Sequence, residues 1–209
     1  MNGSLKLTLA VGTCAAALCL PSVPHVFAAQ TIYNTSVPTV IRVAIRENNP
    51  SGEPDPRGAI SYVQAVPYLD YCEDVLPNEW FPSWNPESLK AGAMAIKMFA
   101  WYHHLHPVTI DGFTFDVDNT TNFQQFRYYS RQPTTNAAFA AIAGDAYTKP
   151  GGEIFELNYR AGIRDNPNWQ YRNAQKMAQW GSQYWAQQGQ TYTQILQFYY
   201  VNRSLYQIT

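Results

Sequence analysis

The sequence predicts an α+β fold in a single domain, and three observations support that prediction. A long, almost uninterrupted apolar stretch, LKAGAMAIKMFAWYHHL (89–105), has the length and composition of a buried helix. Short segments on either side alternate apolar and polar residues, as strands do. No internal repeat or linker divides the chain. We therefore expect a central apolar helix packed against short, mainly antiparallel strands, with a groove at the turn before that helix.

The chain begins with a segment that has the features of an export signal. Lys6 precedes an apolar run over 7–20, and small residues follow at Ala28 and Ala29. The run is shorter than the roughly 20 residues that a membrane span needs, and its end suits cleavage. We expect a signal peptide over 1–29 and one domain over 30–209, secreted and extracellular or cell-wall associated. Membrane contact would be through the export signal alone; an uncleaved anchor is the alternative.

Composition narrows the class of partner. Without residues 1–29 the chain has 13 Lys and Arg against 15 Asp and Glu, a net charge of −2. This charge argues against nucleic acid, whose binding depends on neutralising phosphates. Tyr, Trp, Asn and Gln are abundant, which suits glycans, because rings stack on sugars and amides bond hydroxyls. With the signal removed Cys72 stands alone, so no internal disulfide can form, and its apolar neighbours favour a core thiol over a nucleophile.

The first half of the domain alternates strand, loop and helix. Residues 37–46 have the alternation of a half-buried strand, and the Pro- and Gly-rich segment 48–58 is a loop. Apolar residues at helical spacing predict a helix over 68–76 that Pro77 ends. Glu79 is then expected in a turn between two helices.

The long apolar helix has a clear start. Asn85 suits the N-cap, Pro86 the first helical position, and Glu87 the positive N-terminus. Lys97 interrupts the apolar surface, and a buried cation there needs a partner.

The second half is rich in aromatic and amide residues. We expect a strand, a turn and a short helix over 111–130, a helix over 134–143 capped by Thr135 or Asn136, a turn over 150–152, a strand over 153–162, and helices over 175–188 and 193–200.

Glu79 is the candidate for acid catalysis in this sequence. Beside Trp80, Phe81 and Trp84 its carboxyl would be partly desolvated, which raises its pKa and keeps it protonated near neutral pH. Cleavage of a glycosidic bond requires such an acid. Taken alone, a Glu in an aromatic turn is more often a helix cap or a surface residue than a catalytic acid, and the neighbouring Trp side chains fit either the core or sugar platforms.

The segment YLDYCEDVLPNEWFPSWNPESLKAGAMAIKMFAW (68–101) resembles the signature of the stage II sporulation protein D family, also described as the sporulation and amidase-enhancer domain. That family has a Val-Val-x-x-Glu-Met-Pro turn before a Trp, then a Glu-Ala-Leu-Lys-Ala-Gln-Ala helix with an Arg and a Tyr. The resemblance places Glu79 on the catalytic glutamate, Lys90 on the helix Lys, Lys97 where Arg is usual and Phe99 where Tyr is usual.

The resemblance continues through three later blocks in the same order. DVDNTTNFQQF is similar to an Asp-rich stretch ending in Gln-x-Tyr, which would make Gln125 the matching amide. GGEIFELNYRAG resembles the strand in which Tyr159 has a counterpart, and MAQWGSQYW resembles a Met-Ser-Gln-Tyr-Gly-Ala block with Gln179 in register. We expect substrate binding by Lys97, Gln125, Tyr159, Gln179 and Trp84.

The resemblance implies a lytic transglycosylase of peptidoglycan. Glu79 would protonate the β-1,4 linkage between N-acetylmuramic acid and N-acetylglucosamine, then accept the proton of the sugar's own 6-hydroxyl, leaving 1,6-anhydro ends. No cofactor is implied. The expected partners are peptidoglycan glycan strands. The alternative is a non-catalytic glycan-binding factor that stimulates a cell-wall amidase, which would then be a partner; a structural surface protein is a third interpretation.

Some residues depart from the family pattern. A His-Gly-x-Gly segment of the family is here 172–176, RNAQK, and the Ser and Gly-Gly that usually follow the Tyr159 strand are replaced by 160–162, RAG. Lys97 in place of Arg gives up bidentate pairing. The histidines at 103, 104 and 106 invite a zinc site, but the family's sites use cysteines, and His suits the negative end of a helix. We expect no metal.

Overall fold

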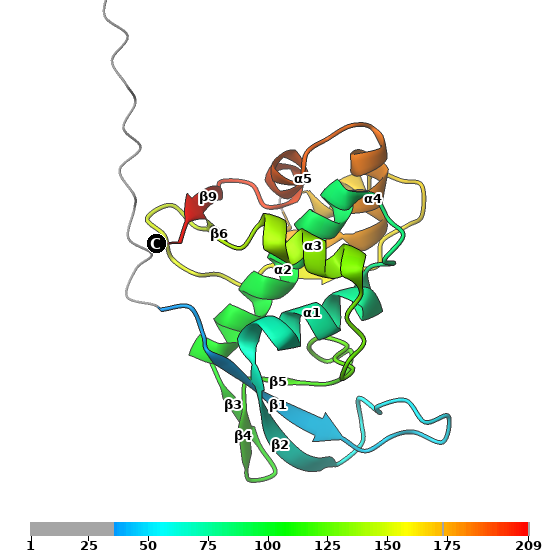
Figure 1. Cartoon of the computed structure of the whole chain (residues 1–209), viewed down its shortest axis with the longest axis vertical. Helices are drawn as coiled ribbons and strands as arrows, with labels where there is room; N and C mark the ends of the chain where they lie inside the picture. The colour runs from blue at the N-terminus through cyan, green and yellow to red at the C-terminus, as the bar shows by residue number, and fades with distance from the viewer. Residues whose placement is uncertain (1–35, 173, 209) are drawn as a thin grey trace, which may run out of the picture.

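The computed structural model describes residues 36–172 and 174–208, and the predicted α+β class is confirmed there (Figure 1). The predicted signal, 1–29, lies outside the described residues. The helices are α1 (Tyr68–Glu79), α2 (Pro86–Leu105), α3 (Pro133–Ala141), α4 (Gln179–Gln187) and α5 (Tyr192–Tyr199), with a 3₁₀ turn at Trp169–Tyr171.

The strands form small sheets in which antiparallel pairing is the commoner kind. The largest has the order β2 (Ile60–Pro67), β1 (Val40–Arg46), β5 (Val117–Asp118), with β2 antiparallel and β5 parallel to β1. Two antiparallel pairs join β3 (Val108–Ile110) to β4 (Phe113–Phe115) and β6 (Asp145–Thr148) to β9 (Ser204–Gln207). A short parallel pair joins β7 (Asn158–Arg160) to β8 (Lys176–Ala178).

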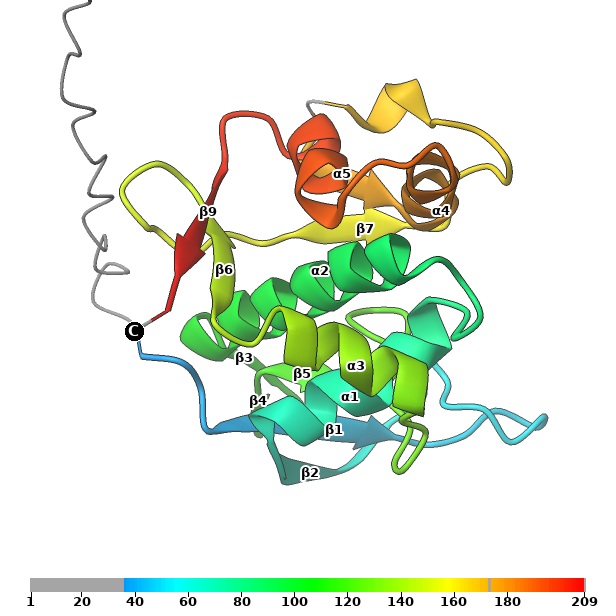
Figure 2. The ribbon, with the colours of Figure 1, turned by 45° about the horizontal axis from the view of Figure 1, so that its top comes forward.

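Helix α2 is the centre of the core, as predicted. Its first turn is capped by Asn85, whose Oδ1 accepts the Glu87 N–H at 2.9 Å, with Pro86 at the first position. Thirteen of its twenty residues are buried, which is possible because neighbours cover both flanks. Figure 2 shows α4, α5 and β7 on one side of α2, and α1, α3 and the β1–β2 pair on the other. Within the described ranges no helix has the length and hydropathy to cross a bilayer.

The predicted end of α1 at Pro77 is wrong, because the helix continues to Glu79. A proline near the C-terminus of a helix removes one hydrogen bond where few remain to be made. The Asp74 carbonyl in this turn also accepts from Asn78 Nδ2 at 2.7 Å and Ser130 Oγ at 2.6 Å, and Trp80 N–H bonds the Leu76 carbonyl. Glu79 is therefore the last residue of a helix rather than part of a turn.

The predicted helix over 175–188 is wrong in its first turn. Lys176–Ala178 forms β8 instead, paired with β7, and α4 begins at Gln179. The expected strand over 153–162 is correspondingly limited to Asn158–Arg160, the stretch that meets β8. Tertiary pairing has overridden local pattern in both segments.

Two smaller expectations also differ. Helix α3 begins at Pro133, so that its N-cap is Gln132 rather than Thr135 or Asn136, and the Thr135 hydroxyl accepts the Gln132 N–H at 3.1 Å. Residues 111–130 contain β4, β5 and turns but no helix.

Candidate active site

The buried ring of Trp80 fixes the end of α1. Trp80 is 1% exposed, its Nε1 donates to Ser182 Oγ at 3.0 Å, and its ring lies edge-on to Tyr159 at 4.9 Å. It reaches α2 because residue 92 is glycine: a Cβ there would lie 2.7 Å from the Trp80 ring. Trp80 thus joins α1, α2 and α4, and the preceding residue, Glu79, is held at their junction.

The Glu79 carboxyl accepts hydrogen bonds from two segments that are distant in the sequence. Its Oε1 accepts the backbone N–H of Gln125 at 2.8 Å, and its Oε2 accepts Gln179 Nε2 at 3.0 Å. The same Gln179 amide donates to the Glu79 carbonyl at 2.7 Å. The structure therefore brings together three of the residues singled out in the sequence, with Gln125 acting through its backbone.

A cavity of about 360 Å³ opens beside this carboxyl. Among the described residues that line it, Glu79 is the only carboxylic acid. The rest of the wall combines three aromatic rings with polar side chains, one of them cationic, and an alanine: Phe99, Thr121, Phe123, Gln125, Tyr159, Arg160, Ala161 and Gln179. A half-enclosed wall that mixes rings with a few polar groups is typical of a ligand site.

Burial raises the pKa of Glu79 above its ordinary value of 4.5. The Gln125 N–H, the Gln179 amide, the Tyr159 hydroxyl and the positive charge of Arg127 act in the opposite direction, and burial outweighs them. The direction agrees with the expectation from the sequence, but the rings that line the cavity are not the expected ones. Phe81 is 57% exposed, and the walls are provided by α2, β7 and the segment before α3.

Behind the cavity lies a buried residue that the sequence reasoning missed. Gln124 is fully buried; its Oε1 accepts the Tyr71 hydroxyl at 3.0 Å and its Nε2 donates to the Tyr159 hydroxyl at 3.2 Å. In the Gln-x-Tyr pattern, the residue two before the aromatic Phe126 is Gln124, not Gln125. That spacing was the signal that could have found it.

Trp84 does not line the Glu79 cavity. Its ring centroid lies 4.7 Å from that of Trp180 and 5.4 Å from that of Phe81, and Trp84 also borders a separate hollow with Pro86 and Leu89. We call Phe81, Trp84 and Trp180 the aromatic cluster. Because Phe81 and Trp180 follow closely after Glu79 and Gln179, the cluster adjoins the carboxyl along the chain.

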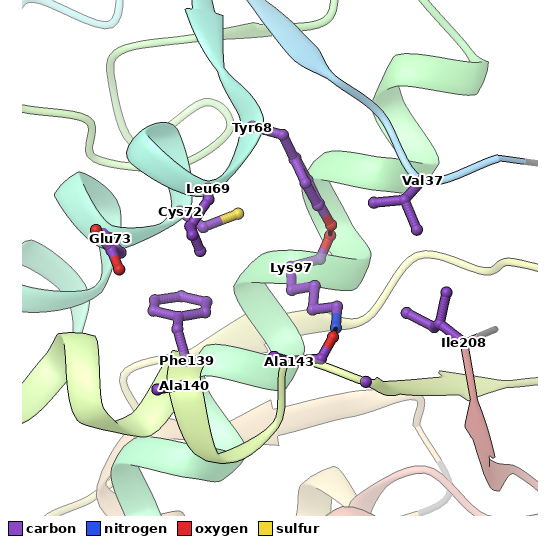
Figure 3. A pocket seen from close by; sticks show the side chains of 11 residues that line it. Val37, Tyr68, Leu69, Cys72, Glu73, Lys97, Phe139, Ala140, Ala143 and Ile208 are labelled. Atoms are coloured by element: carbon purple, nitrogen blue, oxygen red, sulfur yellow. Dashed lines mark hydrogen bonds between the residues drawn. The ribbon is translucent and has the colours of Figure 1, made fainter.

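Lys97 also lies apart from Glu79. It borders a second, mostly apolar cavity of about 330 Å³, shown in Figure 3 with its side chain extended toward Ala143. Its Nζ donates to the carbonyls of Ile142, Ala143 and Asp145 at 3.2, 3.0 and 2.5 Å. Burial lowers its pKa to about 8. The partner that the buried cation requires is thus a set of three carbonyls after α3, and the structure does not bring Lys97 together with Glu79.

His103 and His104 have carboxylate partners, and Cys72 is buried. His103 Nε2 lies 2.9 Å from Glu156, and His104 Nδ1 lies 3.1 Å from Asp116. Within the described residues no group of three or more His, Cys, Asp or Glu side chains is placed to hold a metal. Cys72 is 1% exposed, and burial raises the pKa of its thiol, so it is a core thiol.

The segment that departs from the family pattern at 172–176 lies away from the carboxyl. Arg172 stacks over the rings of Trp169 and Phe198, and 174–176 line another hollow near Glu156. Asn173 is outside the described residues. None of the described members of this segment lines the Glu79 cavity.

Two comparisons with known proteins found similarity to parts of this chain. Residues 56–150 match the family model described as "Stage II sporulation protein" (SpoIID). The range includes Glu79 and Gln125 and ends before Tyr159 and Gln179. An uncharacterized protein of Brachyspira hyodysenteriae is 46% identical over 57 residues, which are 27% of this chain and 15% of that protein. The similarity thus spans only a small part of that relative.

Proposed function

We propose, from the match of residues 56–150 to the stage II sporulation protein family model, that the chain is an exported lytic transglycosylase that cleaves peptidoglycan glycan strands. The bond cleaved is the β-1,4 linkage from N-acetylmuramic acid to N-acetylglucosamine. The family links the protein to sporulation and the cell wall.

One observation carries the proposal: a single, partly buried carboxyl with a raised pKa in a cavity of mixed aromatic and polar walls. Most glycosidases that use water or a covalent intermediate need a pair of carboxylates. When the nucleophile is a hydroxyl of the substrate itself, one carboxyl suffices. The lone Glu79 therefore favours the intramolecular reaction over hydrolysis.

In the proposed reaction Glu79 acts twice. Its protonated carboxyl first gives a proton to the glycosidic oxygen as the bond from that oxygen to C1 breaks. The resulting carboxylate then takes the proton of the 6-hydroxyl while O6 bonds to C1. The products are a 1,6-anhydro end and a free 4-hydroxyl, and Glu79 is protonated again. Gln125 N–H and Gln179 Nε2 hold the carboxylate between these steps.

The polar and aromatic side chains of the wall suit a glycan. Gln125, Gln179 and Tyr159 can bond sugar hydroxyls and acetamido groups, and rings stack on sugar faces. The aromatic cluster, with Phe81 largely exposed, would extend binding beyond the cavity, and Trp84 would bind substrate as part of that cluster.

The second candidate is a glycan-binding factor that stimulates a separate cell-wall amidase. The replaced glycines at 172–176 favour it, since they would alter a flexible segment of the family. The test is digestion of purified glycan strands and whole peptidoglycan, followed by mass spectrometry of the products. We expect 1,6-anhydro ends from the native protein and none from Glu79→Gln. Binding of strands without product, with amidase stimulation that survives Glu79→Gln, would contradict the proposal and support the second candidate.

A further inference from the structure

Three buried side chains, Tyr71, Gln124 and Tyr159, form a chain of hydrogen bonds that reaches the Glu79 cavity; we call this chain the polar file. The Tyr71 hydroxyl donates to Gln124, and the Gln124 amide donates to the Tyr159 hydroxyl oxygen. Tyr159 borders the cavity together with Glu79. Gln124 is fully buried and is not part of the cavity wall, so a substrate bound at Glu79 would not touch it.

The direction of the hydrogen bonds in this file determines where the Tyr159 proton can point. A phenol has one proton and donates it in one direction at a time. Because Gln124 Nε2 donates to the Tyr159 oxygen, the Tyr159 proton is left for another acceptor, and Glu79 is the carboxyl that lines the same cavity. With the opposite polarity a phenol lone pair would face the carboxylate, which is costly where water is excluded.

We propose that Gln124 is a positioning residue that directs the Tyr159 proton at the Glu79 carboxylate. Its catalytic consequence rests on the proposed function. After the leaving group is protonated, Glu79 must persist as a carboxylate until the 6-hydroxyl delivers its proton, and a donor fixed by Gln124 stabilises that ionised state. Gln124 thereby acts on the reaction through Tyr159, without contact to the sugar.

Within the described part of the chain, four titratable or charged side chains lie near Glu79. They are Tyr71 from its own helix, Tyr159 and Arg160 from β7, and Arg127 from the segment before α3. Arg127 is bonded to the carbonyls of Asn119 and Phe126, and Arg160 to the Tyr159 carbonyl. Of the four, the two tyrosines are the groups that bond to Gln124, so a change at 124 reaches Glu79 through this file.

The direct test is a titration of the Glu79 carboxyl by NMR in protein with 13C-labelled glutamate. We expect Gln124→Met to raise the Glu79 pKa, Tyr159→Phe to raise it at least as far, and Gln124→Met to add nothing in the Tyr159→Phe background. Gln124→Glu keeps the shape of the side chain, competes for the Tyr159 proton and adds negative charge, so it should give the largest rise. An unchanged Glu79 pKa in Gln124→Met, or an equal shift in both backgrounds, overturns the proposal.

Steady-state kinetics distinguish a positioning role of Gln124 from a purely structural one. On glycan strands we expect Gln124→Met to lower kcat about tenfold, the loss of roughly one supporting hydrogen bond, with KM changed less than about twofold. Gln187→Met, on the exposed end of α4, is the matched control and should keep native kinetics. An effect on KM alone contradicts the positioning role. The titration needs no turnover, so a native protein without activity would overturn the proposed function and leave the titration result standing.

Discussion

The side-chain amide of Gln179 bonds Glu79 at both its backbone and its side chain. Nε2 lies 2.7 Å from the Glu79 carbonyl oxygen and 3.0 Å from Oε2. Residues a hundred positions apart are thereby locked to each other at the start of α4 and the end of α1. One amide thus holds the carboxyl in position and favours its ionised form.

Removing that amide should change activity and its pH dependence together. Gln179→Leu takes away a donor that favours the carboxylate, so the Glu79 pKa should rise and kcat should fall about tenfold as the carboxyl loses its orientation. Steady-state kinetics across pH measure both effects. Gln187→Leu on the same helix is the control; equal losses in the two variants would show that the effect is not specific to Glu79.

The pH dependence of the native protein follows from the raised pKa of Glu79. The acid that starts the reaction must be protonated, so kcat/KM should fall about tenfold per pH unit above that pKa. Because burial raises the pKa, this fall should begin at a higher pH than the ordinary 4.5 of a glutamate would give. A profile that rises through the same range would contradict the assignment of Glu79 as the acid.

The raised pKa of Glu79 also predicts that the stability of the fold decreases as the pH rises. A carboxyl whose pKa is raised in the folded state stabilises the fold fully below its unfolded pKa, and that stabilisation is lost as pH rises through the folded value. Gln at position 79 does not titrate, so the Glu79→Gln variant does not lose this stabilisation. Its free energy of unfolding, compared with that of the native protein, should therefore increase as the pH rises. Urea denaturation at pH 4.5 and pH 8 measures the difference. A constant difference would show that the pKa is not raised.

Gly92 is predicted to be essential for the site although it lies outside the cavity. In Gly92→Ala the new Cβ would meet the Trp80 ring at 2.7 Å, and the ring has no room to move because it is buried. We expect a loss of roughly 1–3 kcal/mol in the free energy of unfolding, from overpacking, and reduced activity. Gly144→Ala is the control, since its nearest neighbour lies at 3.4 Å. A stable, fully active Gly92→Ala would disprove the role of Trp80 as an anchor.

Lys97 should affect stability with a particular pH signature. Its pKa falls from 10.5 to about 8 on folding, so between these values the unfolded chain binds more protons and folded stability rises with pH. Relative to Lys97→Met, the native protein should gain up to about 1.4 kcal/mol per pH unit between pH 8 and 9.5. Chemical denaturation at several pH values tests this. Parallel curves for the two proteins would contradict it.

How far the sequence predicted the fold depends on where each signal came from. Helix α2 was foreseen because capping by Asn85 and Pro86 and an apolar run agree locally. The end of α1 and the strand β8 were not, because they depend on groups distant in sequence: Ser130 bonds the last turn of α1, and Tyr159 pairs with Met177 across β7 and β8. Short strands such as β6 and β9 likewise exist only through their pairing.

The site residues, too, were predicted from the sequence only in part, because some of their positions depend on contacts between distant parts of the sequence. Glu79, Gln125 and Gln179 were named from the sequence and meet in space, and Tyr159 borders the same cavity. Lys97 sits on a helix whose face could not be read from spacing alone, because α2 is buried nearly all round. Trp84 joined a cluster of rings that only the approach of α4 creates.

The most direct test of the central claim is the analysis of glycan-strand products by mass spectrometry for the native protein and for Glu79→Gln. The account predicts 1,6-anhydro ends from the native protein and their absence with Glu79→Gln, which should still bind strands. Anhydro ends released equally by Glu79→Gln would contradict it.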